Sequence, residues 1–144
     1  MKVAVITGVN GQDGIYLSKL LIDKGYKVIG TVRSYRLLDL TNFNYIGVES
    51  KDLIIEELDL MDMANIIRFI KKYQPDEIYN LAAQSSVSQS FDQSIGTFSF
   101  NTGSVNNLLE SIKLICPEAK LYQASSSEMY GKADSLPIKI SSPM

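Results

Sequence analysis

The sequence has no histidine, and this absence narrows the chemistry that the chain can perform. Histidine is the most common general base and the most common zinc ligand in proteins. A Ser/His/Asp triad is therefore excluded, and we expect no metal site. Acid and base chemistry has to use other groups.

Cysteine and long hydrophobic runs are also scarce. Cys116 is the single cysteine, so no internal disulfide can form, and this is typical of a reducing cytosol. The first apolar run, residues 3–6, is too short for a secretory leader, and no stretch approaches the roughly 18 apolar residues of a membrane span. We expect a cytoplasmic protein that does not interact with membranes.

Runs of basic residues are missing as well. The formal net charge is −2, and the lysines and arginines do not cluster, which argues against nucleic-acid binding by bulk electrostatics. A phosphate-binding site would have to be local. Apolar residues make up 45% and charged residues 21%, as in ordinary globular proteins, and 144 residues suit one domain.

What the chain does contain is an alternation of strand and helix patterns. We predict strands at residues 3–6, 27–32, 53–58, 77–81 and 120–124, helices at residues 14–24, 61–73 and from Ser94 to before Pro117, and irregular structure at residues 34–50. Parallel strands need crossover helices, and these crossovers are right-handed. The pattern predicts an α/β fold, a Rossmann-type doubly wound parallel sheet of order 3-2-1-4-5 over residues 1–144.

A glycine-rich loop joins the first strand to the first helix. Gly8, Gly11 and Gly14 recur three residues apart as GxxGxxG. Glycines at such a point permit a tight turn, let backbone N–H groups approach a pyrophosphate, and let the helix pack close to the strand. In this strand–turn–helix context we predict dinucleotide binding rather than a merely structural turn.

Arg33 ends the second strand, about 20 residues after Gly14. An enzyme that uses NAD commonly has a carboxylate there for the ribose hydroxyls, and this chain has none. A guanidinium can instead pair with a 2′-phosphate, so we favour NADP, and the alternative is a solvated surface arginine. Asp59, after the third strand, could accept a hydrogen bond from adenine or cap the next helix.

Two later loops leave alternatives open. Residues 80–86 are mostly small and could let a ribose or nicotinamide pass close to the backbone, or could form a packing turn. Ser125, Ser126, Ser127 and Glu128 follow the fifth strand, where hydroxyls beside a carboxylate suit proton transfer to a sugar. Ser125 and Glu128 also fit the S-x-x-E spacing of a helix capping box.

Four segments carry a resemblance that covers nearly the whole chain. They are TGVNGQDGIYL at residues 7–17, EIYNLAAQS at 77–85, SFD at 90–92 and YQASSSEMYG at 122–131. In these segments the chain resembles the extended short-chain dehydrogenase/reductases, and among them the GDP-mannose 4,6-dehydratase family. Sugar epimerases are similar elsewhere, but they usually lack an acid after the serines.

The resemblance implies a lyase that acts on GDP-mannose or a related nucleotide sugar, with transient hydride transfer to NADP. Ser126 would bond the sugar C4 hydroxyl, Glu128 would be the acid/base at C5 and C6, and Ser127 would support them. The motifs and the resemblance together assign cofactor binding to Gly8, Asn10, Gly11, Gln12, Asp13, Gly14, Arg33, Asp59, Leu60, Leu81, Ala82, Ala83, Gln84 and Ser85.

The chain also departs from the family. The catalytic Tyr-x-x-x-Lys pair is missing, since the residue four after Tyr130 is Asp134. We expect the carboxy-terminal substrate domain to be absent. Residues 34–44 differ from the family's basic loop, and Gly96 stands where the family commonly has a tyrosine. We expect an incomplete Rossmann domain that is inactive alone, and a homo-oligomer of the full-length enzyme stays open. The alternatives are another nucleotide-sugar dehydratase or epimerase, or a non-catalytic NADP-binding module.

Overall fold

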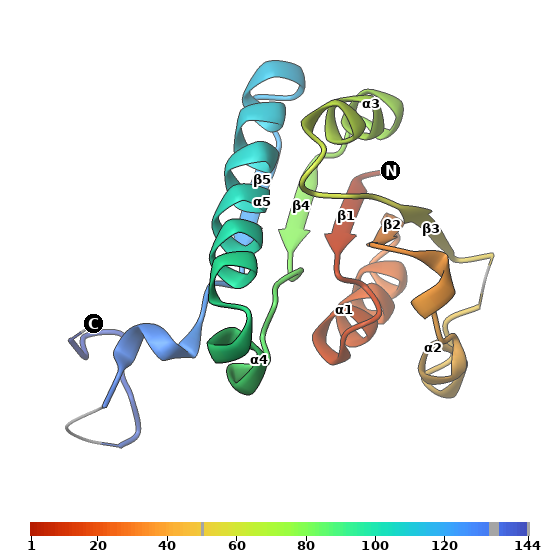
Figure 1. The fold of residues 1–144 in the computed structure, drawn as a ribbon. Helices are drawn as coiled ribbons and strands as arrows, with labels where there is room; N and C mark the ends of the chain where they lie inside the picture. Colours follow the sequence, from red (N-terminus) through yellow and green to blue (C-terminus); the bar gives the residue numbers. More distant parts are fainter. Residues whose placement is uncertain (50, 133–135, 144) are drawn as a thin grey trace.

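The computed structural model describes residues 1–49, 51–132 and 136–143, and a five-stranded parallel sheet lies at its centre (Figure 1). Its strands are β1 (Val3–Thr7), β2 (Lys27–Val32), β3 (Leu53–Glu57), β4 (Glu77–Asn80) and β5 (Lys120–Gln123). The order β3-β2-β1-β4-β5 confirms the predicted topology. All four strand pairings are parallel, with β1 between β2 and β4.

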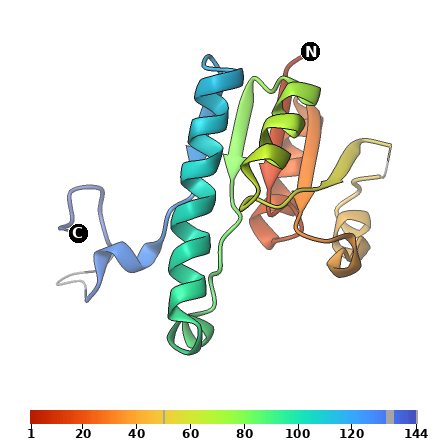
Figure 2. The same ribbon diagram turned by 45° about the horizontal axis from the view of Figure 1, so that its top comes forward.

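Helices cover both faces of the sheet. They are α1 (Gln12–Asp23), α2 (Thr41–Tyr45), α3 (Met63–Tyr73), α4 (Val87–Asp92) and α5 (Ser94–Ile115), with the 3₁₀ turns η1 (Tyr35–Leu37) and η2 (Ser127–Tyr130). The long α5 packs beside α3 on one face, whereas α1 lies on the other face against β1 and β2 (Figures 1 and 2). This two-sided cover is the doubly wound arrangement that the alternating pattern predicted.

The apolar residues of β1 supply both layers of the core. Ala4 and Ile6 belong to the cluster on the α1 side, whereas Val5 belongs to the cluster on the α3 and α5 side. Successive side chains of a strand point to opposite faces, so a strand covered on both faces is apolar throughout. This is why residues 3–6 form an unbroken hydrophobic run.

The segment that we expected to be irregular, residues 34–50, contains η1 and α2, so that prediction was wrong in part. Phe43 of α2 is only 2% exposed and joins the α1-side core together with Val48. Because α2 has five residues, it is too short for a helical repeat of apolar residues to reveal it. Burial of one aromatic side chain marks this helix instead.

The start of α3 and the segment before α5 also differ from the prediction. Helix α3 begins at Met63 rather than at Met61, because the Asp62 side chain accepts a hydrogen bond from the backbone N–H of Asn65. The short α4 precedes α5 and was not predicted. It begins after Ser86, whose hydroxyl accepts from the N–H of Gln89.

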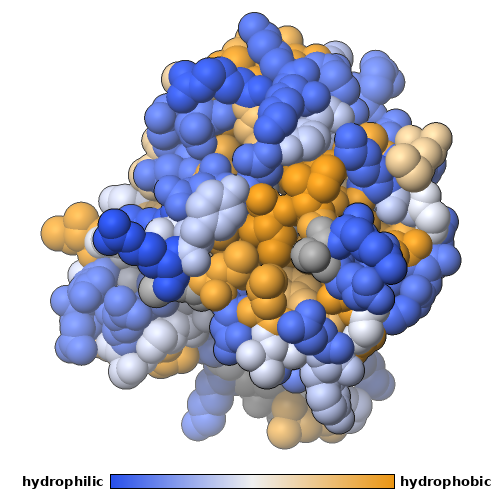
Figure 3. All heavy atoms as spheres, turned by 90° about the vertical axis from the view of Figure 1, so that its right-hand side faces the viewer, coloured by the Kyte–Doolittle hydropathy of each residue, from blue (hydrophilic) through white to orange (hydrophobic). Residues whose placement is uncertain are grey.

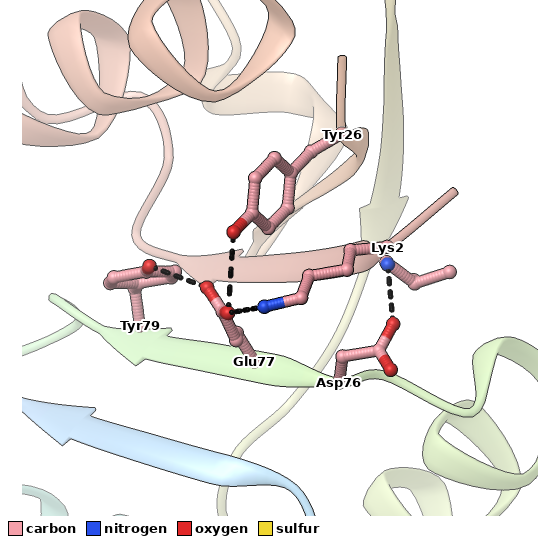
Figure 4. A network of polar contacts seen from close by, with 6 residues as sticks. Lys2, Tyr26, Asp76, Glu77 and Tyr79 are labelled. Carbon is pink, nitrogen blue, oxygen red and sulfur yellow. Dashed lines mark hydrogen bonds and ion pairs between the residues drawn. The ribbon is translucent and has the colours of Figure 1, made fainter. Parts of the chain in front are cut away.

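Where the parallel strands begin, a polar network joins β1 to β4 (Figure 4). The Glu77 carboxylate accepts hydrogen bonds from Lys2 Nζ at 2.9 Å, Tyr79 Oη at 2.8 Å and Tyr26 Oη at 3.3 Å. The bond from Lys2 is the main cause that lowers the pKa of Glu77, followed by the bond from Tyr79. Burial, then its bond to Glu77, raises the pKa of Tyr79 to about 12.

The face seen from the β3 edge carries a patch of hydrophobic residues surrounded by hydrophilic ones (Figure 3). Strand β3 is the last strand on that side of the sheet, and its Ile54 is 38% exposed.

Across residues 1–49, 51–132 and 136–143, no helix has both the length and the apolar character needed to span a bilayer.

Candidate functional site

The carboxyl ends of β1, β4 and β5 are joined by a chain of buried and part-buried hydrogen bonds. The hydroxyl of Thr7 accepts from the backbone N–H of Ala82 at 3.2 Å and donates to Asn80 Oδ1. Asn80 Nδ2 in turn donates to Gln123 Oε1 at 2.7 Å. Thr7 is 1% and Asn80 0% exposed, so these bonds fix the strand ends and set the starting points of the loops that follow.

Close contacts in the glycine loop require the absence of a side chain at two positions. Gly8 has φ +66°, and a Cβ there would lie 3.0 Å from the backbone N and Cα of Ala82. A Cβ on Gly14 would lie 2.6 Å from the carbonyl oxygen of Val9. The loop after β1 therefore lies against the loop after β4, and α1 packs closely on the first loop.

The amino terminus of α1 begins at the glycine loop. Gly11 is its N-cap residue, and no side chain makes a capping hydrogen bond there among the described residues. Unpaired N–H groups and the helix dipole favour an anion at such a position. The geometry fits a pyrophosphate, which needs close approach to backbone N–H groups rather than to long side chains.

A groove of about 700 Å³ lies next to this loop, and we call it the first cavity. Its wall is formed by the loops after β1, β2, β3 and β4 and by the amino-terminal half of α5. A cavity of this volume is within the usual range for small-molecule sites. Ten of the predicted cofactor residues line it, namely Gly8, Asn10, Gly11, Arg33, Leu60, Leu81, Ala82, Ala83, Gln84 and Ser85.

Four predicted cofactor residues do not line the first cavity. Gln12 and Asp13 are exposed in the first turn of α1, and Gly14 is buried where α1 packs on the loop. Asp59 Oδ1 accepts a hydrogen bond from the N–H of Met61 at 2.9 Å. Asp59 therefore stabilises a turn, and the cap of α3 is Asp62 instead.

Arg33 lies at the exposed mouth of the first cavity, directly after β2. It makes no ion pair with any residue that the structure describes. The neighbouring Ser34 also lines the cavity, and its hydroxyl oxygen accepts from the N–H of Arg36 at 3.4 Å. A guanidinium without a carboxylate partner is available to bind an anionic group of a ligand.

A second cavity of about 810 Å³ adjoins the first and shares its wall at Ala82, Ala83, Gln84, Ser85 and Thr97. Ser126 and Glu128 line this second cavity, and both are exposed. The two cavities therefore bring the predicted catalytic pair next to the loop after β4. One elongated ligand could extend from the glycine loop towards Glu128.

The capping-box alternative for Ser125 and Glu128 is wrong. Ser126 is the N-cap of η2, and its hydroxyl oxygen accepts from the N–H of Glu128 at 3.2 Å. Ser125 instead has φ +60°, a backbone conformation that redirects the chain after β5. Because Ser126 uses only an acceptor site in this bond, its hydroxyl proton can still be donated to a ligand.

Sequence reasoning missed the contribution of α4 and α5 to the site. The additional residues on these helices and their junction that line the first cavity are Gln89, Gln93, Gly96, Thr97, Ser99 and Phe100. The Oγ1 atom of Thr97 is buried and has no hydrogen-bond partner among the described residues. Polar residues in the amino-terminal half of a long helix were the available signal, but the pattern alone does not show which face meets a cavity.

Metal ligands do not gather at this site. Within the part of the chain that the structure describes, no group of three or more Cys, Asp or Glu side chains could hold a metal ion. The polar groups of the two cavities are hydroxyls, amides, one guanidinium and one carboxylate. They suit a polar organic ligand that carries phosphate.

Comparison with known families gives a match over almost the whole chain. The family model described as GDP-mannose 4,6 dehydratase matches residues 5–144. The GDP-mannose 4,6-dehydratase of Yersinia enterocolitica is 38% identical over 149 residues, which cover 99% of this chain and 40% of that protein. The enzyme of Dictyostelium discoideum is 39% identical over 99% of this chain and 42% of its own length. The chain thus spans about two fifths of the curated relatives it matches.

Solved structures share the fold at lower identity. The UDP-glucose 4-epimerase of Bifidobacterium longum, in complex with NAD⁺ and UDP, has a TM-score of 0.85 at 24% identity over 99% of this chain and 42% of that one. The UDP-N-acetylglucosamine 4-epimerase of Methanobrevibacter ruminantium, in complex with UDP-N-acetylmuramic acid, has a TM-score of 0.81 at 28% identity over 99% and 44%. These similarities support the Rossmann-type fold.

Proposed function

The chain belongs to the GDP-mannose 4,6-dehydratase family, and from this premise we propose that it is the NADP-binding part of an enzyme that dehydrates GDP-D-mannose to GDP-4-dehydro-6-deoxy-D-mannose. The observation that carries the proposal is the first cavity, which joins the glycine loop, Arg33 and the loop after β4 in one groove. This groove continues into the second cavity, where Glu128 lies.

Backbone groups would hold the pyrophosphate of the cofactor. The start of α1 and the loop at Gly8 and Gly11 offer N–H groups and a favourable dipole. Leu60 would contact the adenine from the loop after β3, and Ala82 and Ala83 would let the ribose or nicotinamide pass close to the backbone. When bound, the cofactor supplies the capacity to accept a hydride and return it.

Arg33 would bind the 2′-phosphate that distinguishes NADP from NAD. Its guanidinium has no carboxylate partner within the described residues and lies at the groove where β2 ends. Ion pairs between arginine and phosphate are strong because charge and hydrogen-bond geometry match. The Bifidobacterium longum epimerase was solved with NAD⁺, so the choice of cofactor is a separate test.

Ser126 and Glu128 would act on the sugar in the second cavity. The hydroxyl proton of Ser126 can be donated to the oxygen at C4, because its acceptor bond with the N–H of Glu128 leaves that proton available. The Glu128 carboxylate would take the proton from C5, and the resulting acid would protonate the C6 hydroxyl, which leaves as water. One positioned carboxyl group thus performs both proton transfers of the elimination, first as a base at C5 and then as an acid at the C6 hydroxyl.

The chain by itself would bind the cofactor without turnover. No tyrosine in the sequence is followed four residues later by a lysine, so the pair that assists hydride transfer in the resembled family is missing. A sugar epimerase is the second candidate, because solved neighbours carry that activity. Glu128 favours the dehydratase, since the elimination needs an acid and base at C5 and C6.

Cofactor selectivity tests the proposal. NADPH and NADH are titrated into the chain and into Arg33→Asp, and binding is followed by cofactor fluorescence. Loss of a charged phosphate contact should lower the affinity for NADPH by roughly 10- to 100-fold, because such bonds contribute about 1.5–3 kcal/mol. The affinity for NADH should change much less.

A matched control is Arg68→Asp, since Arg68 is exposed on α3 and lies outside both cavities. Equal losses of NADPH and NADH affinity in Arg33→Asp would contradict the phosphate role. Consumption of GDP-mannose by the chain alone would contradict its expected inactivity.

A further inference from the structure

The side chain of Asn101 on α5 binds the loop after β4 through the backbone N–H and carbonyl groups of a single residue, Gln84. Its Oδ1 accepts from the backbone N–H of Gln84 at 2.8 Å, and its Nδ2 donates to the carbonyl oxygen of Gln84 at 3.0 Å. Gln84 lines both cavities and lies outside the helices and strands, and its backbone makes no bond to another backbone group among the described residues. The side-chain amide therefore replaces the pairing that regular structure would supply.

Asn107, almost two turns further along α5, holds the loop after β3. Its Nδ2 donates to the carbonyl oxygens of Leu60 at 3.1 Å and Met61 at 3.4 Å. Gly103, between the two asparagines, allows a close approach, because a Cβ there would lie 3.2 Å from the Met61 side chain. Leu60 and Met61 both line the first cavity.

The two asparagines thus hold opposite ends of one groove. Arg33 and Leu60 mark the end where the adenosine 2′-phosphate and adenine would lie, and Gln84 marks the end that continues to Glu128. Building on the proposed function, we infer that Asn101 and Asn107 are positioning residues: Asn107 sets the adenosine half of the cofactor groove and Asn101 sets its nicotinamide half.

The structure suggests why this role falls to a helix. Residues 58–62 and 81–86 are outside the helices and strands, so their backbone can adopt several conformations unless another element fixes it. Helix α5 has 22 residues and packs on α3, so it provides a rigid support. A short side chain on a rigid helix positions a loop more accurately than contacts within the loop.

Alanine at these positions tests positioning without harming the helix, because alanine is the best helix former. The chain, Asn101→Ala and Asn107→Ala are titrated with NADPH and with adenosine 2′,5′-bisphosphate, which contains only the adenosine half. Asn101→Ala should lower the affinity for NADPH on the order of tenfold and leave the affinity for the bisphosphate within about twofold of wild type. Asn107→Ala should weaken both ligands by a similar factor.

Lys113→Ala is the control, since Lys113 is an exposed α5 residue outside both cavities. It should change neither affinity. Equal effects of Asn101→Ala on both ligands, or no effect of either asparagine variant, would overturn the assignment of halves. A wild-type chain that binds neither ligand would overturn the cofactor proposal and, with it, the assignment to cofactor halves.

Amide hydrogen exchange separates these failures from a failure of the hydrogen bonds themselves. Asn101→Ala should speed exchange at the Gln84 amide, which donates to Asn101, and leave residues 59–62 unchanged. Asn107→Ala should speed exchange at residues 59–62 and leave Gln84 unchanged. Unchanged exchange at both loops would overturn the positioning role whatever the ligands do.

Discussion

At the glycine loop, the absence of a Cβ atom determines how closely neighbouring backbone segments can pack. The distance of 2.6 Å from a Cβ on Gly14 to the Val9 carbonyl oxygen is shorter than any ordinary contact. The Thr7 hydroxyl and the Asn80 side-chain amide each make two hydrogen bonds, and these bonds fix the neighbouring strand ends. At this scale, small and polar residues at the strand ends position the backbone for a ligand.

Gly14→Ala should destabilise the chain by about 1–3 kcal/mol, because the new methyl group has to displace backbone rather than a flexible side chain. Gly96→Ala is a matched control, since each glycine is the third residue of its helix and a Cβ on Gly96 meets nothing within 4 Å. That control should gain up to about 1 kcal/mol from helix propensity. Urea unfolding followed by circular dichroism measures both, and equal effects of the two changes would refute the packing argument.

Helices and strands each serve more than one purpose in this fold. Helix α5 packs on α3 through residues such as Leu108 and Ile112 and also holds two loops of the groove. Strand β4 ends at Asn80 in the site and begins at Glu77 in the polar network. The strand therefore extends from the polar network at one end of the sheet to the candidate site at the other end.

The hydrogen bonds of Glu77 should make the free energy of unfolding depend on pH in the acid range. The lowered pKa of Glu77 means that the folded state favours the carboxylate, so this stabilisation is complete above about pH 4.5 and is lost as the pH falls through the lowered pKa. Glu77→Gln should cost about 1 kcal/mol or less at neutral pH, and the difference from wild type should vanish in acid.

Unfolding free energies measured between pH 7 and pH 3 test this dependence. Glu118→Gln is the control, because Glu118 is exposed and makes no ion pair within the described residues. The control should follow the wild-type curve. A Glu77→Gln deficit that stays constant down to pH 3 would show that the carboxylate charge contributes nothing.

The molecule as a whole is a five-stranded domain with exposed apolar side chains on its outer helix. Ile95 and Phe98 of α5 are 81% and 71% exposed, whereas Leu108 and Ile112 further along the helix are buried. The chain spans about two fifths of its relatives' length. The loops after β1, β2, β3 and β4 and the amino-terminal half of α5 together form the wall of the first cavity.

NADP should stabilise the whole domain, because a ligand that binds only the folded state adds free energy by mass action. At about 100 times its dissociation constant the gain is roughly 2.7 kcal/mol, which for a domain of this size raises Tm by roughly 10 °C. Differential scanning fluorimetry with an extrinsic dye measures the shift. Adenosine lacks the phosphates that the loop would bind and should give a much smaller one, whereas an equal shift with adenosine would argue against phosphate recognition.

The order of the sheet and the place of the glycine loop were determined by sequence alone. Apolar runs such as residues 3–6 and the glycines at Gly8 and Gly14 are local signals, since strand burial and close packing leave their mark on adjacent residues. The sequence also placed Arg33 and Glu128 after strands that end at the same edge. Parallel topology then requires their loops to be neighbours.

Only the tertiary structure decided which other groups complete the site. Asn101 and Gln84 are 17 residues apart in sequence and Asn107 and Leu60 are 47 apart, so no local pattern could pair them. Asn101 and Asn107 bind these loops from α5, because the polar groups of irregular backbone must find partners wherever the fold brings them.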